Sequence, residues 1–135
     1  MAVLQWSQEL SVRVSSLDAQ HQTMIALVNE LHDAVSTGRP RLFVDAAIEK
    51  LIEYTREHFS FEERCLLTAC YRRFEHHQCE HGELAAKVDA LHWRHRAGDA
   101  SAAAELVEVL TRWIDRHLRG SDRSYTEDLI RIGAV

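Results

Sequence analysis

The stretch "HHQCEH", residues 76–81, gathers three histidines, one cysteine and one glutamate within six positions. His77 and His81 are four residues apart, so on a helix they project to the same side. Leu84 and Val88 continue this side, which predicts that both rings face a core. The stretch alone fits a zinc site, a thiol redox site, a charged helix face or a fragment of a larger centre. The rest of the chain must decide between these interpretations.

Four long segments with helical periodicity account for most of the chain, and its one proline and five glycines fall almost entirely between them. We expect Asp18 to be the N-cap of the first helix, and Gly38 and Gly98 to end the first and third. The first 17 residues form a non-periodic arm that carries Trp6. Short connections make neighbouring helices antiparallel. The sequence therefore predicts an all-α, up-down-up-down four-helix bundle, one domain over 1–135, with helices over about 18–37, 42–69, 73–97 and 101–119.

Composition excludes several classes of partner. A net charge of −5 offers no basic surface for nucleic acid or anionic membrane. No apolar run approaches the roughly 20 residues of a membrane span, and the first residues lack the pattern of a signal peptide. Three cysteines are too few for a disulfide scaffold, which indicates reduced thiols. We therefore expect a cytoplasmic protein.

Histidines lie on the inward apolar stripe of all four predicted helices. His21 shares its stripe with Ile25, and His58 shares its stripe with Leu51. His117 lies on the same stripe as Leu110, two helical turns later. Glu62 lies four residues after His58, on the same side. Burying five imidazoles and a carboxylate without partners would cost several kcal/mol. A bound metal would replace the lost hydration of all of them together.

The number of candidate ligands exceeds what one metal ion needs. A structural zinc site takes four ligands, whereas five histidines and Glu62 already make six. Asp122 adds a carboxylate, but it is five residues after His117, about 140° away on a regular helix. The two can converge only if the backbone bends or unwinds, which Gly120 permits. A two-metal centre bridged by Glu62 and Asp122 would use every one of these groups.

These residues, in this order, resemble the hemerythrin family, and closely the single-domain bacterial hemerythrins. The resemblance runs from Trp6 through "LDAQH" (17–21), "HFSFEE" (58–63), "CYRRFEHHQCEH" (70–81) and "WIDRHLRGSDRSY" (113–125). It implies two non-haem iron ions, bridged by Glu62, Asp122 and an oxo or hydroxo group. One ion would be held by His77, His81 and His117, and the other by His21 and His58. The second ion would keep an open position, where dioxygen can bind. The resemblance also implies a monomer, and no obvious apolar patch stands out in the sequence.

The ligand set favours a dioxygen carrier over an enzyme. Di-iron oxygenases use mostly carboxylates with Glu-x-x-His motifs, and this sequence contains none. We expect reversible dioxygen binding for storage, transport or delivery to an oxygen-consuming enzyme. A sensor of oxygen, nitric oxide or redox state, an enzyme acting on peroxide or nitric oxide, and an iron reservoir remain alternatives. Apolar residues on the same stripes are expected to shield the site or simply to fill the core: Ile25, Val28, Phe59 and Trp113.

Some positions depart from the family pattern or lie outside it. The turn that commonly reads Gly-Tyr-Pro is Cys70, Tyr71, Arg72 here, which leaves its geometry open. Cys65 is expected to be a small buried hydrophobe, and Cys79 to lie opposite the ligand face. Tyr125 and Tyr71 are expected to contact the ligands or cap a helix. The remaining histidines are expected to be structural or solvated: His32, His76, His92 and His95.

Overall fold

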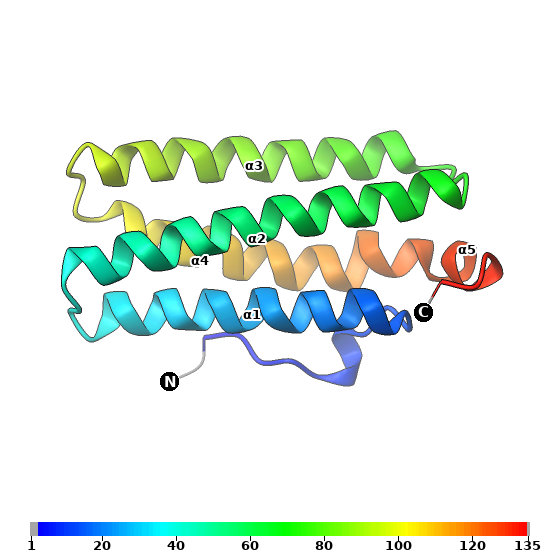
Figure 1. The fold of residues 1–135 in the computed structure, drawn as a ribbon, viewed down its shortest axis with the longest axis horizontal. Coiled ribbons are helices and arrows are strands. Elements are labelled where there is room, and N and C mark those ends of the chain that lie inside the picture. The colour runs from blue at the N-terminus through cyan, green and yellow to red at the C-terminus, as the bar shows by residue number, and fades with distance from the viewer. Residues whose placement is uncertain (1–2, 135) are drawn as a thin grey trace.

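The computed structural model describes residues 3–134, and its four long helices form an antiparallel bundle (Figure 1). These are α1 (Ser15–Ser36), α2 (Arg41–Thr68), α3 (Phe74–Arg96) and α4 (Ala102–His117). Each helix packs against the next, and α1 packs against α4, which closes the bundle. The predicted up-down-up-down architecture is confirmed, and three of the four helices have bounds within one or two residues of those expected.

The arm before α1 corrects one prediction. The helix begins at Ser15, three residues earlier than expected, and Val14 rather than Asp18 occupies the N-cap position. The Asp18 carboxylate instead accepts hydrogen bonds from Ser11 Oγ at 2.6 Å and from the Val12 amide at 2.8 Å. It therefore fixes the arm against the first turn of α1. A negative charge at this end of the helix also interacts favourably with the helix dipole.

Glycine ends two of the helices, as predicted. Gly38 follows α1 with φ 65°, and Gly98 follows α3 with φ 100°. Both values lie in the region where a side chain would be strained. The chain can therefore reverse within a few residues at each of these ends.

A cysteine adopts the left-handed conformation at the third reversal. Cys70, directly after the end of α2, has φ 54° and is exposed. Glycine is the residue that adopts this conformation without strain. A non-glycine residue pays about 1–2 kcal/mol for this conformation. The turn thus keeps its left-handed geometry despite the departure in sequence, at a cost in strain.

Replacing Cys70 with glycine is therefore expected to stabilise the protein. The relieved strain exceeds the extra chain entropy of glycine, so we expect the free energy of unfolding to rise by about 0.5–1 kcal/mol. Urea unfolding followed by circular dichroism measures the change. Cys70→Ala is the control, because it removes the thiol but keeps Cβ. A glycine variant no more stable than the alanine variant would contradict this account of the turn.

The chain continues beyond the four expected helices. A π-helical segment η2 (Leu118–Asp122), a 3-10 turn η3 (Arg123–Tyr125) and a short helix α5 (Thr126–Arg131) follow α4. Tyr125 and Leu129 of these segments are fully buried. They belong to a small apolar cluster with Leu17 of α1 and Leu66 of α2.

Polar residues separate this small cluster from the main apolar core. The main core is built from the rest of the four helices and includes Met24, Leu51, Leu84 and Leu110. Between the two clusters, every helix changes from apolar to titratable side chains. His21, for example, lies between Leu17 of the small cluster and Met24 of the main core.

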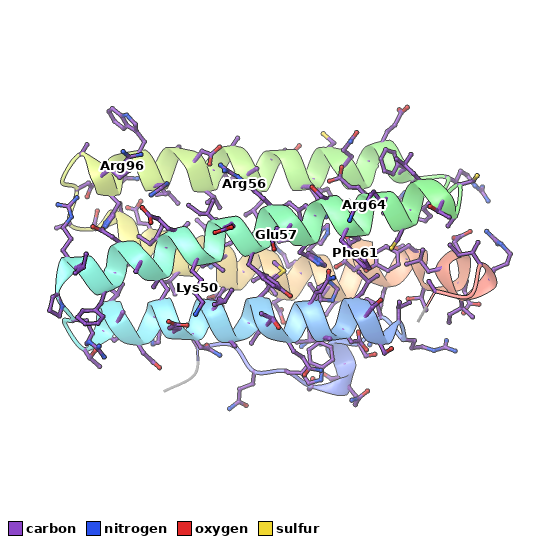
Figure 2. All side chains as sticks on the ribbon, viewed as in Figure 1. Lys50, Arg56, Glu57, Phe61, Arg64 and Arg96 are labelled. Carbon is purple, nitrogen blue, oxygen red and sulfur yellow. The ribbon has the colours of Figure 1, made fainter. Side chains whose placement is uncertain are left out.

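The outer faces of the helices are charged. Figure 2 shows Lys50, Arg56 and Glu57 of α2 and Arg96 of α3 projecting outward, and all four are exposed. Within residues 3–134, no helix has the length and apolarity needed to cross a membrane.

Candidate metal centre

Seven titratable residues predicted as ligands meet inside the bundle. All seven are buried, and none of their exposed fractions exceeds 4%. They come from the four long helices and from the π-helical segment that follows α4. The seven are His21, His58, Glu62, His77, His81, His117 and Asp122.

Their nitrogen and oxygen atoms form two overlapping groups suited to metal ions. In each group, the candidate ligand atoms lie within 4.8 Å of one another. We call the first the three-histidine group; it consists of Glu62, His77, His81, His117 and Asp122. The two-histidine group consists of His21, His58 and Glu62. Glu62 belongs to both.

The two carboxylates lie between the groups. Glu62 Oε1 lies 2.5 Å from His77 Nε2, whereas its Oε2 lies 3.5 Å from His21 Nε2 and 3.4 Å from His58 Nε2. Asp122 Oδ1 lies 2.8 Å from His117 Nε2, and its Oδ2 lies 3.2 Å from His21 Nε2. Each carboxylate thus turns one oxygen toward each group.

The π-helical segment brings Asp122 to His117. On a regular α-helix these residues, five apart, would diverge by about 140°. The wider i to i+5 turn over Leu118–Asp122 aligns them instead. The predicted departure from regular helix at Gly120 is therefore present, as a π turn rather than a sharp bend.

Several buried polar atoms at the centre lack hydrogen bonds. Among the described residues, His81 Nε2, His117 Nε2 and both Asp122 oxygens have no hydrogen-bond partner, although charged atoms lie close by. An unmade hydrogen bond of this kind costs about 1–3 kcal/mol. Nitrogen and oxygen atoms that are near one another but not aligned as hydrogen bonds indicate lone pairs directed at a shared cation. The donor set therefore fits a metal ion, and imidazole with carboxylate suits iron, among other transition metals.

The outer nitrogens of two rings support the same interpretation. His58 Nδ1 lies 2.6 Å from the side-chain amide oxygen of Gln20, Oε1, and His81 Nδ1 lies 2.9 Å from Glu63 Oε2. These oxygens can only accept, so each Nδ1 donates. When the ring is neutral, its Nε2 then carries a lone pair that faces the centre.

Protons take part in balancing the buried charge when no metal is bound. Burial alone lowers the pKa of His21, but the adjacent carboxylates of Asp122 and Glu62 outweigh it and raise that pKa to about 9. Burial opposed by the same two carboxylates leaves the pKa of His77 at about 10. Burial acts to raise the pKa of Glu62, but contacts with four imidazoles hold it well below the usual range. The carboxylates are thus anionic, and a metal would displace protons from the rings.

Apolar rings cover the three-histidine group. Phe59 stacks on His81 with ring centroids 3.8 Å apart, and Trp113 stacks on His117 at 3.9 Å. Ile25 and Val28 are buried in the main core. Of the four residues expected to shield the site, two therefore lie directly against ligand rings.

Tyr125 contacts the centre, as expected. Its hydroxyl donates a hydrogen bond of 2.9 Å to Glu62 Oε2, and its side chain is fully buried. The other tyrosine, Tyr71, meets Tyr125 edge to face with ring centroids 6.3 Å apart. Tyr125 thus orients the carboxylate that both groups share.

Removing the Tyr125 hydroxyl is expected to weaken the metal-free fold. A hydrogen bond to a charged group contributes about 1.5–3 kcal/mol, so Tyr125→Phe should lower the free energy of unfolding by about 2 kcal/mol. Urea unfolding of the metal-free protein measures the loss. Tyr54→Phe, at a half-buried tyrosine on α2, is the control and should change stability little. Equal losses in the two variants would show that the Glu62 contact contributes nothing.

Residues outside the centre partly match expectation. Cys79 is exposed, as predicted, but Cys65 is only half-buried rather than buried. His76 is exposed and lies 3.1 Å from Glu80. His95 lies near the other end of α3, and its Nε2 is 2.6 Å from Asp45 Oδ1 of α2. His95 therefore has a structural role, because it links α3 to α2.

Comparison with known proteins agrees with the fold and with the cluster. The family model described as "Hemerythrin HHE cation binding domain" matches residues 12–128. A bacteriohemerythrin of Stenotrophomonas maltophilia is 33% identical over 129 residues, which cover 96% of this chain and 83% of that protein. A bacteriohemerythrin of Methylococcus capsulatus is 30% identical, with 93% of this chain and 95% of that protein covered.

Solved structures agree as well. A crystal structure of wild-type hemerythrin superposes with a TM-score of 0.89 at 29% identity, covering 95% of this chain and 98% of that one. A crystal structure of a hemerythrin mutant, in which alanine replaces a leucine, gives a TM-score of 0.90 at 30% identity, covering 96% and 98%. The match extends over nearly the whole bundle, including the segments that carry all seven buried residues. The chain therefore belongs to the hemerythrin family.

Proposed function

We propose that this protein binds dioxygen reversibly at a pair of non-haem iron ions, for storage, transport or delivery of oxygen. His77, His81 and His117 would hold one ion, and His21 and His58 the other. Glu62 and Asp122 would bridge them. A pair of ferrous ions held there would supply the two electrons that reversible dioxygen binding requires.

The observation that carries this proposal is the unequal composition of the two groups. Both carboxylates extend an oxygen toward each group, but one group adds three imidazoles and the other only two. With equal carboxylate sharing, an ion in the two-histidine group has one protein ligand fewer. That difference supports an open position for a small molecule on the two-histidine side.

The surroundings of the rings favour release of oxygen over further chemistry. Phe59 and Trp113 cover His81 and His117 and keep water from them. Water and protons promote irreversible oxidation of such centres, so apolar contacts of this kind prolong the ferrous state. The Tyr125 hydroxyl also lies at the centre, where it donates its hydrogen bond to Glu62. Burial raises the pKa of Tyr125 well above the usual range, so this hydroxyl keeps its proton.

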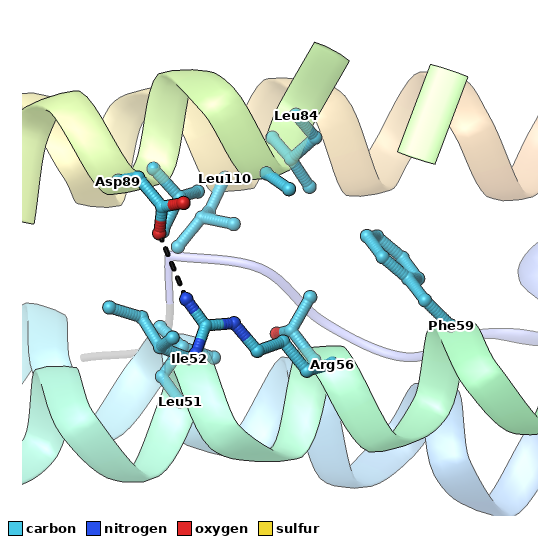
Figure 3. A pocket seen from close by; sticks show the side chains of 10 residues that line it. Leu51, Ile52, Arg56, Phe59, Leu84, Asp89 and Leu110 are labelled. Carbon is cyan, nitrogen blue, oxygen red and sulfur yellow. Dashed lines mark hydrogen bonds and ion pairs between the residues drawn. The ribbon is translucent and has the colours of Figure 1, made fainter. Parts of the chain in front are cut away.

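An apolar cavity adjoins this wall. Figure 3 shows it between α2, α3 and α4, lined by Phe59 and by the Arg56–Asp89 ion pair, which is 3.1 Å long. Its volume of about 20 Å³ suffices for one small molecule, and its walls are mainly aliphatic. A space of this size beside Phe59, which itself stacks on His81, supports a small apolar ligand such as dioxygen. The aliphatic walls include Leu51, Ile52, Leu84, Val88 and Leu110.

Repeated oxygenation of the iron-loaded protein tests the proposal. The metal-free protein is loaded anaerobically with ferrous iron, analysed for iron, exposed to oxygen and purged with argon through several cycles. We expect two irons per chain, uptake of one dioxygen per chain, and a visible absorption that appears and disappears with each cycle. Irreversible oxidation in the first cycle, or continuous consumption of oxygen or peroxide, would support a sensor or an enzyme instead. One zinc per chain as the native metal would overturn the proposal.

A further inference from the structure

The outer nitrogens of the candidate ligands have unequal partners in the two groups. In the three-histidine group, His81 Nδ1 lies 2.9 Å from Glu63 Oε2 and His117 Nδ1 lies 3.4 Å from Glu80 Oε2. Both partners are carboxylates. The second contact is longer and is an ion-pair contact rather than an aligned hydrogen bond.

In the two-histidine group the corresponding partners carry no charge. His58 Nδ1 lies 2.6 Å from the side-chain amide oxygen of Gln20, Oε1. His21 Nδ1 is buried and has no hydrogen-bond partner among the described residues. The two groups therefore differ by two negative charges just outside their rings.

Other residues fix the two outer carboxylates in place. Gln78 Nε2 donates to Glu63 Oε1 at 3.0 Å, so the Glu63 carboxylate bridges Gln78 and His81. Ser121 Oγ donates to Glu80 Oε1 at 2.6 Å, which leaves Oε2 for His117. Their side chains are 21% and 26% exposed, so both carboxylates are partly withdrawn from water.

A carboxylate that accepts from the outer nitrogen makes an imidazole a stronger donor to a metal than a neutral amide does. A stronger donor stabilises the higher oxidation state. We propose that Glu63 and Glu80 make the ion in the three-histidine group the first to be oxidised. Gln20, which is neutral, leaves the ion in the two-histidine group ferrous at that stage. This inference rests on the proposed iron pair, and within it Glu63 and Glu80 act as positioning residues through His81 and His117.

The corresponding step is a one-electron transfer to an external oxidant. With ferricyanide, the diferrous protein gives a ferric ion in the three-histidine group, a ferrous ion in the two-histidine group, and ferrocyanide. No covalent bond is formed or broken. The proton in the His81–Glu63 hydrogen bond stays between the two residues and shifts toward Glu63 as the positive charge on the metal grows.

Stepwise potentiometric oxidation of the protein loaded with ⁵⁷Fe tests the assignment, with Mössbauer spectra recorded at each stage. Glu63→Gln keeps the shape and the acceptor but removes the charge. We expect it to disfavour the first oxidation by about tenfold, or about 59 mV, and the second by much less. Glu80→Gln should act in the same direction more weakly, because its contact is longer.

Gln20→Glu provides the reverse change on the other group. It should favour the second oxidation by about tenfold and move the first step little. Glu57→Gln is the matched control: it removes the same charge from an exposed position on α2, next to His58 in sequence, and should move neither step.

The outcomes separate this inference from the function beneath it. Unequal shifts in opposite steps, for Glu63→Gln and Gln20→Glu, support the assignment. Equal shifts of both steps would reduce it to a general charge effect, and unmoved potentials would leave the two carboxylates a purely structural role; either result overturns it while iron binding and oxygen cycling stand. A wild-type protein that binds no iron pair would overturn the proposed function itself.

Discussion

Replacing Glu62 with alanine is expected to abolish the paired metal centre. Glu62 is the one residue common to both metal-binding groups among those described. Its Oε1 lies 2.5 Å from His77 Nε2 and 3.1 Å from His81 Nε2, while its Oε2 faces His21 and His58. The adjacent carboxylate of α2, Glu63, instead contacts the outer nitrogen of His81.

The loss should be close to complete for the two-histidine group. Without Glu62, that group retains two imidazoles and a single oxygen from Asp122. Outer partners alone alter metal affinity by about 10–100-fold, so loss of a direct bridging ligand should cost at least the upper end of that range. We expect iron content to fall from two per chain to one or none, together with the visible absorption and the oxygen response.

Iron analysis after anaerobic loading and gel filtration measures this effect. Glu57→Ala, at an exposed position on the same helix, is the control and should retain two irons. The Glu62→Ala protein should still fold in the metal-free form, because the apolar clusters on both sides of the centre are unchanged. A Glu62→Ala variant that still binds two irons per chain would refute the bridging role.

The helices and the meeting of the seven candidate ligands inside the bundle were predictable for the same physical reason. The apolar period of each helix fixes an inward face, and titratable side chains on that face must meet one another. His77 and His81 share a face because they are four residues apart, whatever the rest of the chain does. The sequence therefore predicts which helix faces meet, and the structure brings all seven residues together.

Features set by local backbone geometry were harder to predict. Asp18 is a residue type typical of an N-cap, but the helix starts earlier. Its carboxylate instead accepts hydrogen bonds from Ser11 and Val12 of the preceding arm. Asp122 could be placed only on the condition that the helix departs from regularity. The short segments after α4 were missed because their buried apolar residues, Leu118, Tyr125 and Leu129, are too few to form a period.

The outer partners of the rings were missed for a different reason. Gln20 is adjacent to His21 in sequence but bonds His58 of another helix, and Glu80 is adjacent to His81 but faces His117. Contacts between helices depend on how the helices rotate against each other, which a period does not specify. The usable signal was a polar residue beside a candidate ligand, at the half-buried positions Gln20, Glu63 and Glu80.

Removing the metal is expected to lower stability strongly without unfolding the protein. A ligand present at a thousand times its dissociation constant stabilises the folded state by about 4 kcal/mol. For a chain of this size that corresponds to a fall in Tm of roughly 15 °C on removal. The metal-free protein should stay helical, because its two apolar clusters bury large side chains from every helix. Calorimetry of the iron-loaded and chelator-treated protein measures the difference.

The difference should also grow with pH. The pKa values of His21 and His77, raised to about 9 and about 10, exceed the value of about 6.5 for histidine in an unfolded chain. The protons on these rings therefore stabilise the metal-free fold fully below about pH 6.5, and this stabilisation is lost as pH rises through 9 to 10. Above that range, Glu62 and Asp122 are left as buried anions without their counter-charges.

In the iron-loaded protein the metal replaces these protons, so its stability should change little between pH 7 and 10. The metal-free Tm should fall over the same interval, and iron uptake should release protons into a weakly buffered solution. Both effects arise from one cause, because the buried carboxylates require positive charge whether protons or metal ions supply it. A metal-free Tm that stays constant or rises between pH 7 and 10 would show that the carboxylates are balanced in some other way.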